Sequence, residues 1–217
     1  MDIKPFKGFR PRPEYSAQVA SRPYDVLDSN EAREEAKGNS YSFLNVVKPE
    51  ITLAVDTDPY SQEVYEAGKQ NFQAMIDQEI FIQDDNDSLY VYELTMDGRS
   101  QTGIVACAAV KDYMEGRIKK HELTRPDKET DRKNHVRISM LNAEPVFFAY
   151  KSRTDLDEII DNVKQGQAVY NFVADDGIGH RLWIVDSDTV IQSIVNIFSK
   201  MTETYVADGH HRTAAAA

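Results

Sequence analysis

The sequence is poor in the residues that build disulfides and zinc fingers. Its 217 residues include a single cysteine, Cys107, and a single tryptophan. One cysteine excludes an intrachain disulfide and any structural zinc site made of cysteine pairs. Cys107 lies in the apolar run 104–110, so we expect it to be a buried small hydrophobic residue.

Long apolar runs and the common nucleotide-binding signatures are absent as well. No apolar segment approaches the roughly 18 residues that a membrane-spanning helix needs, and no signal peptide is recognisable, so we expect a cytoplasmic protein. The sequence has no Gly-x-x-x-x-Gly-Lys-Ser/Thr loop and no Gly-x-Gly-x-x-Gly after a strand. A phosphate site in this chain must therefore be built in another way.

The charge of the chain is strongly acidic. The formal net charge is −11 and the pI is about 4.9, which argues against a nucleic acid or an anionic membrane as the main partner. Residues 115–137 are an exception, with eight Lys and Arg against five Asp and Glu. A local positive segment in an acidic protein fits a small anionic ligand better than a polymer.

Capping signals and hydrophobic periodicity predict a mixed α+β fold over residues 1–217, as a single domain. We expect helices near 28–37, 58–78, 126–142, 154–166 and 186–199. We expect hairpins from 89–95 with 103–110 and from 168–174 with 180–185, and strands at 42–47, 146–150 and 205–207. The sequence stops inside an expected helix that has no capping residue, which favours the N-terminal portion of a longer protein.

The last stretch carries the clearest chemistry. Residues 205–207 predict a short strand, Gly209 breaks it, and the alanine run to Ala217 favours a helix. A strand that turns on glycine into a helix directs backbone N–H groups at an anion. The same turn carries Asp208, His210, His211 and Arg212. Because a helix rotates by about 100° per residue, we expect one histidine and Arg212 on the ligand and the other histidine in support.

Phosphoryl transfer to a hydroxyl also needs a carboxylate that accepts or orients the proton. Glu122 lies beside His121 in the basic segment and is the best candidate for this base; the alternative is a surface glutamate in a charged loop. Asp25, after Arg22-Pro23-Tyr24, is a second candidate, and its alternative is an ordinary turn residue.

Several motifs occur in one order along the chain. They are Arg22-Pro23-Tyr24-Asp25-Val26, Leu89-Tyr90-Val91-Tyr92-Glu93, Arg99 with Gly103, Lys120-His121-Glu122 with Thr124, Asp131-Arg132, and Asp208-Gly209-His210-His211-Arg212. This set resembles the domain-of-unknown-function family number 1015 across essentially the whole chain. Members of that family are about twice this length, which agrees with the longer parent protein expected above.

Two of these motifs also resemble the free-serine kinases of the ParB/sulfiredoxin-like fold. Those kinases carry a Lys-Pro-His-Glu stretch and an Asp-Gly-His-His-Arg turn; here Lys120 stands where they have proline. The resemblance implies a ParB/sulfiredoxin-like core with added hairpins and helices. It further implies that Glu122 is the base on the serine hydroxyl and that Asp208, His210, His211 and Arg212 bind phosphate and magnesium.

Residues and resemblance together predict a small-molecule phosphotransferase that uses Mg2+ with ATP or ADP and acts most simply on free serine. The predicted catalytic residues are Glu122 and His211, and the predicted metal ligand is Asp208. The predicted phosphate-binding residues are Lys120, His121, Asp208, Gly209, His210, His211 and Arg212, with Arg22, Asp25 and Arg132 as secondary candidates. One alternative is a non-catalytic sensor of a nucleotide or phosphorylated metabolite at the same turn. A ParB-like nuclease is a further alternative, which the acidic charge disfavours.

Overall fold

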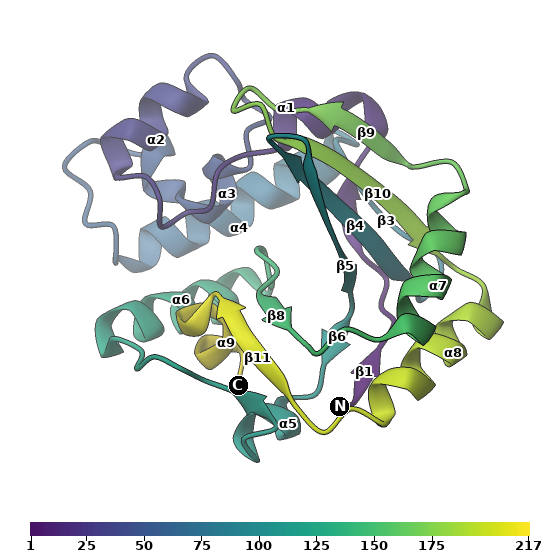
Figure 1. The fold of residues 1–217 in the computed structure, drawn as a ribbon. Helices are drawn as coiled ribbons and strands as arrows, with labels where there is room; N and C mark the ends of the chain where they lie inside the picture. Colours follow the sequence, from purple (N-terminus) through teal and green to yellow (C-terminus); the bar gives the residue numbers. More distant parts are fainter. The chain divides into compact units, whose positions relative to one another are not determined.

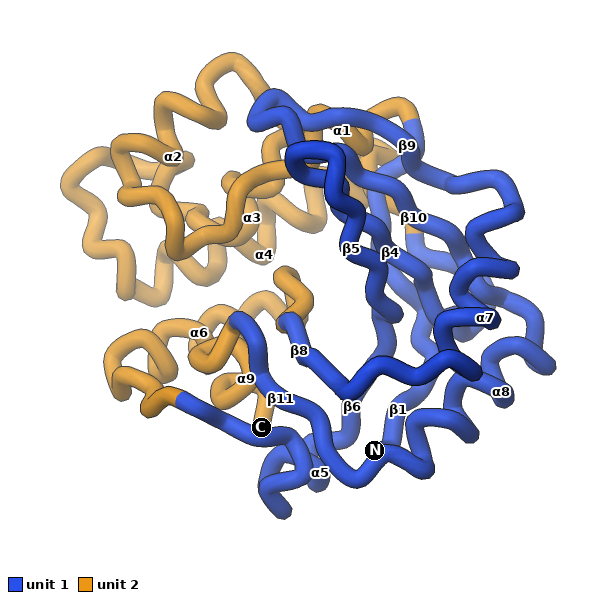
Figure 2. The backbone as a smooth tube through the Cα atoms, viewed as in Figure 1, with its two compact units in different colours: residues 1–13, 83–121, 147–208 blue, residues 14–82, 122–146, 209–217 orange.

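The computed structural model describes residues 1–217 and confirms the mixed α+β class. The chain forms two compact units, each assembled from three separate segments (Figure 2). Unit 1 contains residues 1–13, 83–121 and 147–208, and unit 2 contains residues 14–82, 122–146 and 209–217. The expectation of a single domain stays a prediction. None of the helices has both the length and the apolar character that crossing a bilayer requires.

Unit 1 is built on a four-stranded antiparallel sheet with the order β5-β4-β10-β9. Its strands are β4 (Leu89–Met96), β5 (Arg99–Val105), β9 (Tyr170–Val173) and β10 (Gly179–Val185). Both predicted hairpins are therefore confirmed. The turn between β4 and β5 places Asp97 at φ 51° and Gly98 at φ 76°, the two positive values that a tight hairpin turn requires.

One face of this sheet is the core of unit 1. Leu89 and Val91 on β4 and Trp183 and Val185 on β10 alternate onto that face and are buried. Helices α7 (Thr154–Lys164) and α8 (Asp188–Ser199) cover them (Figure 1). Both helices were predicted, because their apolar residues recur at helical spacing.

A buried carboxylate lies on the same face of β4. Glu93 is 1% exposed and forms ion pairs with Arg181 on β10 at 2.6 Å and with Lys164 at the end of α7 at 2.5 Å. Thr102 on β5 donates a further hydrogen bond at 2.9 Å. Burial alone would raise the pKa of Glu93, but the donors Lys164 and Thr102 and the charge of Arg181 bring it below its ordinary value.

The remaining strands of unit 1 are short. β1 (Ile3–Lys4) pairs with β6 (Cys107–Ala108), and β11 (Thr204–Asp208) lies parallel to β7 (Ile118–Lys119) and antiparallel to β8 (Phe147–Ala149). Strand β2 (Phe9–Pro11) and helix α5 (Val110–Met114) complete the unit. The expected burial of Cys107 is wrong: the residue is exposed, since β6 has two residues and pairs only with β1.

Unit 2 is mainly helical. Its helices are α1 (Ser16–Val19), α2 (Ser29–Ala36), α3 (Leu44–Val47), α4 (Gln62–Asp77), α6 (Pro126–Ser139) and α9 (His210–Ala216), with a 3-10 turn at Pro49–Thr52. A second 3-10 turn (Pro13–Tyr15) and the strand β3 (Phe81–Gln83) lie where the chain passes from one unit to the other. Helix α2 begins with a complete capping box: Asp28 accepts from the N–H of Glu31, and Glu31 accepts from that of Asp28.

The predicted strand at 42–47 is wrong, because residues 44–47 form helix α3 and residues 42–43 precede it without forming a strand. Leu44, Val46 and Val47 are all buried, so neither alternation nor helical spacing distinguishes them in the sequence. A short apolar run bounded by polar residues fits a buried strand and a buried helical turn equally well.

Candidate functional site

The predicted strand, glycine turn and helix at the end of the chain are confirmed. Strand β11 ends at Asp208, Gly209 has φ 86°, and α9 begins at His210. A Cβ atom at position 209 would lie 3.0 Å from Val146 Cγ1 and 3.3 Å from the Arg212 guanidinium. Both the positive φ and the close neighbours therefore require glycine at this position.

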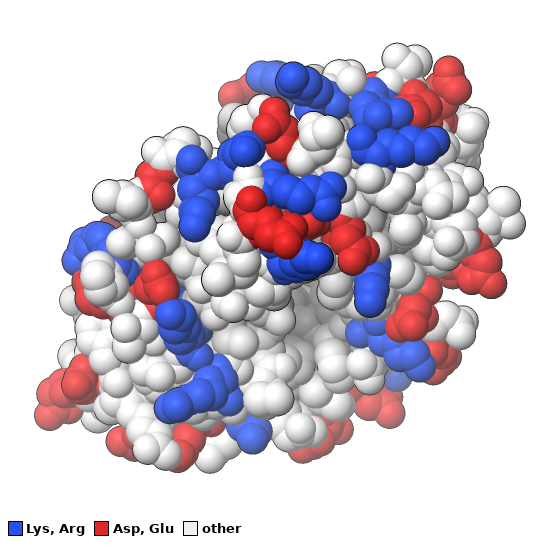
Figure 3. Space-filling view, turned by 90° about the horizontal axis from the view of Figure 1, so that it is seen from below, with Lys and Arg blue, Asp and Glu red and all other residues white.

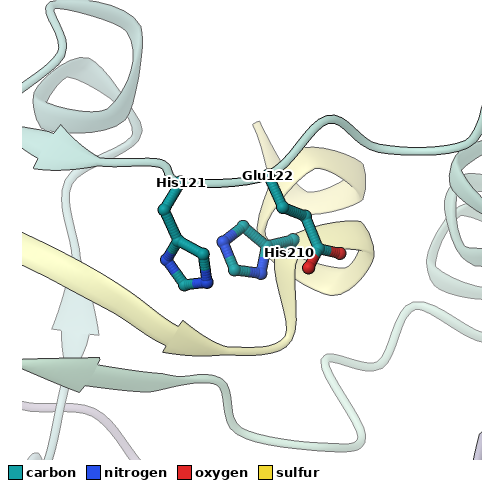
Figure 4. Close-up of side chains that lie close together, drawn as sticks. All are labelled: His121, Glu122 and His210. Carbon is teal, nitrogen blue, oxygen red and sulfur yellow. The ribbon is translucent and has the colours of Figure 1, made fainter.

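Glu122 lies next to this turn. It is exposed, in an irregular segment between β7 and the proline that begins α6. Its carboxylate and a ring nitrogen of the buried His210 lie within 4.8 Å of each other, and both residues belong to unit 2. His121 is bonded to Glu122, and Figure 4 shows its ring beside the same two side chains. The fold thus brings together two predicted motifs that are far apart in the sequence.

His211 has a different task from His210. Its Nε2 accepts a hydrogen bond from the backbone N–H of Arg125 at 3.1 Å. An imidazole nitrogen that accepts a hydrogen bond carries no proton, so the neutral ring has its proton on Nδ1. The bond connects α9 to the residue that precedes α6 and so fixes the course of the chain three residues after Glu122.

The same segment is held at a second point. Thr124 donates to the Glu129 carboxylate at 2.9 Å, and Lys133 donates to it from the next turn of α6. The hydrogen bond from Lys133, and to a smaller extent that from Thr124, lowers the pKa of Glu129 below its ordinary value. Residues 124 and 125 are therefore fixed to α6 and α9, while the side chain of Glu122 extends into solvent.

Arg212 points back toward the chain before β8. One of its terminal nitrogens donates to the carbonyl oxygen of Pro145 at 3.0 Å. The neighbouring Glu144 accepts a hydrogen bond from the backbone N–H of Tyr24 at 3.0 Å. Burial raises the pKa of Glu144, and the positive charges of Arg212 and Arg132 partly oppose that rise.

Arg132 belongs to this arrangement as well. Its guanidinium lies 4.0 Å from the centre of the Tyr24 ring and forms an ion pair with Asp131 at 2.7 Å. Asp131 also accepts a hydrogen bond from the Tyr65 hydroxyl at 3.0 Å. Arg132 is 9% exposed and already holds two partners, so its geometry is that of a supporting residue.

The other predicted site residues are Lys120, Arg22, Asp25 and Asp208. Lys120 lies over the ring of Tyr113 in unit 1, 4.2 Å from its centre. Arg22 forms an ion pair with Glu35, and Asp25 is exposed in the loop before α2. Asp208 is the exposed last residue of β11, in unit 1.

A comparison with protein-family models identifies one family. The model described as Protein of unknown function (DUF1015) matches residues 3–217. The chain belongs to this family. No curated protein and no solved structure matches it. Family membership gives no activity by itself, so for this DUF1015 chain the function must be argued from the site.

Sequence reasoning missed two residues of this DUF1015 site. Glu144 was not recognised, because its partner Tyr24 lies 120 positions earlier in the chain. Arg125 was counted only as part of the basic segment, although its backbone N–H, rather than its charge, contacts His211. A partly buried acidic residue and a backbone donor leave no pattern in a single sequence, and only the folded chain identifies them.

Proposed function

We propose that this protein is a phosphotransferase that moves a phosphoryl group from a nucleotide to the hydroxyl of a small molecule, most simply free serine. The observation that supports it is the distance of at most 4.8 Å between the Glu122 carboxylate and the His210 ring in unit 2. A base and a phosphate-binding turn must act on the same pair of reactants, so they must lie within a few ångströms of each other.

In this proposal Glu122 is the base. Its carboxylate takes the proton of the acceptor hydroxyl as the oxygen attacks the terminal phosphorus of ATP or ADP. The bond from that phosphorus to the bridging oxygen breaks, and the shortened nucleotide leaves with the electron pair. Because Glu122 is exposed, an acceptor can approach it directly.

The turn at 209–212 would bind the phosphates. His210 and Arg212 supply donors, while His211 holds the segment that carries Glu122 through the N–H of Arg125. Mg2+ bound with the nucleotide would neutralise the phosphate charge, and the exposed carboxylate of Asp208 is the type of oxygen ligand that Mg2+ prefers.

Charge supports a small substrate over a polymer. The net charge is −11. On the face seen in Figure 3, Lys and Arg side chains are interspersed with Asp and Glu side chains. A nucleic-acid binder usually gathers its positive charge on one face.

The direct test measures phosphoserine formed from serine with Mg2+ and either ATP or ADP. We expect product with the wild type and a loss of at least about 100-fold for Glu122→Gln, because the amide cannot accept the proton. The control is Glu158→Gln, an exposed glutamate on α7, which should leave the rate unchanged.

Calorimetry with the same nucleotides separates this proposal from a sensor. Absence of product with both donors, together with nucleotide binding that Glu122→Gln leaves unchanged, would contradict the enzyme and favour the non-catalytic sensor.

A further inference from the structure

The side chains around Glu122 include imidazole rings, which a magnesium site does not need. His210 offers an imidazole nitrogen and Glu122 a carboxylate oxygen within 4.8 Å of each other. His121 precedes Glu122 directly, and Figure 4 shows its ring beside the other two side chains. Mg2+ prefers oxygen ligands, whereas imidazole nitrogen suits Zn2+ and its neighbours in the first transition series.

We propose that Glu122 and His210, with His121 as the third ligand, bind a borderline divalent cation of the Zn2+ type. Two histidines and one glutamate form a ligand set found in catalytic zinc sites, where a fourth position stays open. The three residues lie on an irregular segment and at the start of a helix. They do not share the helical spacing of common zinc motifs, so no sequence motif predicts the site.

The distances allow this with a small movement. Two ligand atoms that are each about 2.1 Å from one Zn2+ ion lie at most about 4.2 Å apart. The separation of the Glu122 and His210 ligand atoms is at most 4.8 Å, which is close to that limit. His210 is 7% exposed and sits in a fixed position at the start of α9, whereas Glu122 is exposed and can rotate toward it.

His211 and Glu129, two other potential metal ligands of unit 2, already have hydrogen-bond partners. His211 Nε2 accepts the N–H of Arg125, and Glu129 holds Thr124 and Lys133. A cation at Glu122 is therefore expected to recruit His210 and His121 rather than these two.

The site has a consequence that rests on the proposed function. A carboxylate whose lone pairs bind Zn2+ cannot accept a proton from a substrate hydroxyl. Zn2+ would then inhibit transfer by occupying the base, while Mg2+, which enters with the nucleotide, would not.

The test is calorimetric titration of the full chain with Zn2+ alone, in a non-chelating buffer without nucleotide, compared with Mg2+ alone. We expect one Zn2+ per chain and no comparable Mg2+ binding. Changing an outer-shell partner typically weakens metal binding about 10- to 100-fold, and loss of a ligand should cost more. Glu122→Gln and His210→Gln should therefore each weaken Zn2+ binding by at least about 100-fold.

Two matched controls use residues of unit 1, whereas Glu122 and His210 belong to unit 2. His180→Gln changes a histidine that stacks on Phe172, and Glu158→Gln changes an exposed carboxylate; both should bind Zn2+ like the wild type. Because Glu122 is exposed, its variant tests the site even where His210→Gln fails to fold. Replacing Zn2+ by Co2+ gives a second readout, a visible absorption band that depends on nitrogen ligands.

No Zn2+ binding, or equal binding by the wild type and Glu122→Gln, would overturn the inference. The result is independent of the phosphotransferase assay, since it contains no nucleotide or acceptor. Zn2+ binding without phosphoserine formation would support the Zn2+ site and contradict the phosphotransferase proposal. Phosphoserine formation without Zn2+ binding would support the phosphotransferase and contradict the Zn2+ site.

Discussion

The Glu144 carboxylate accepts a hydrogen bond from the backbone N–H of Tyr24 at 3.0 Å, across 120 positions of the sequence. Tyr24 belongs to the Arg22–Asp25 motif, and Glu144 stands beside the carbonyl that Arg212 contacts. A partly buried carboxylate and the carbonyl group of the next residue thus connect Tyr24 with Arg212 within unit 2.

This carboxylate makes the stability of the protein depend on pH. Burial raises its pKa in the folded protein above the ordinary 4.5, so above pH 4.5 the unfolded chain ionises first and the folded chain holds more protons. This contribution therefore lowers the free energy of unfolding as pH rises from about 4.5 through the folded pKa.

Glu144→Gln keeps an acceptor oxygen for Tyr24 but cannot ionise. We expect the free energy of unfolding of the variant, relative to the wild type, to increase as pH rises across this window. Urea unfolding at a series of pH values measures the difference. If the difference in free energy of unfolding does not change with pH, Arg212 and Arg132 compensate the Glu144 charge completely. The pKa of Glu144 would then not be raised, and the prediction would be wrong.

Gly209 and Gly98 form a matched pair for measuring crowding at the turn. Both have positive φ, but a Cβ at Gly98 meets nothing within 4 Å, whereas one at Gly209 meets Val146 and Arg212. We expect Gly98→Ala to cost about 1–2 kcal/mol of stability from backbone strain alone and Gly209→Ala about 2–4 kcal/mol. Thermal or urea unfolding of both variants measures these losses. Equal losses of stability would mean that Val146 and Arg212 move aside for the added methyl group without an energetic cost.

The buried ion pairs of Glu93 predict a further loss. Glu93→Gln removes the negative charge that Arg181 and Lys164 share in their ion pairs. We expect a loss of about 2–3 kcal/mol, less than for a fully enclosed pair, because the Arg181 side chain is 43% exposed and retains water.

The ion pairs of Glu93 also set the sign of its pH dependence. The pKa of Glu93 is lowered in the folded protein, so its stabilising contribution is present above the ordinary 4.5 and is lost as pH falls below it. Wild type and Glu93→Gln should therefore converge in stability at acid pH. A difference that persists unchanged there would indicate lost packing rather than lost charge.

Local signals predicted the parts of the fold that depend on neighbouring residues. The turn at Asp97 and Gly98 and the glycine turn before α9 were predicted, because positive φ favours these residue types wherever they occur. The segment 42–47 was assigned to the wrong class, since its burial in unit 2 comes from partners distant in the sequence. Cys107 was misjudged for a related reason: its apolar neighbours do not reveal that β6 is an edge strand.

For the site, the sequence predicted residue types but not their connections. Glu122 and the 208–212 turn were chosen as separate fragments, and their proximity became visible only in the folded chain. The bond from Arg125 to His211 and that from Tyr24 to Glu144 use backbone N–H groups, which every residue except proline possesses. Such contacts have no sequence signature.

The way the chain passes between the two units limits how it can be divided. Each unit draws on three segments, and the chain passes between the units at 13–14, 82–83, 121–122, 146–147 and 208–209. No single continuous piece of the gene encodes either unit, and two of the passages fall beside Glu122 and His210. Removing more than residues 1–13 from one end, or more than residues 209–217 from the other, would thus remove part of both units. A protease that cuts at 121–122 would separate His121 from Glu122 within the candidate site.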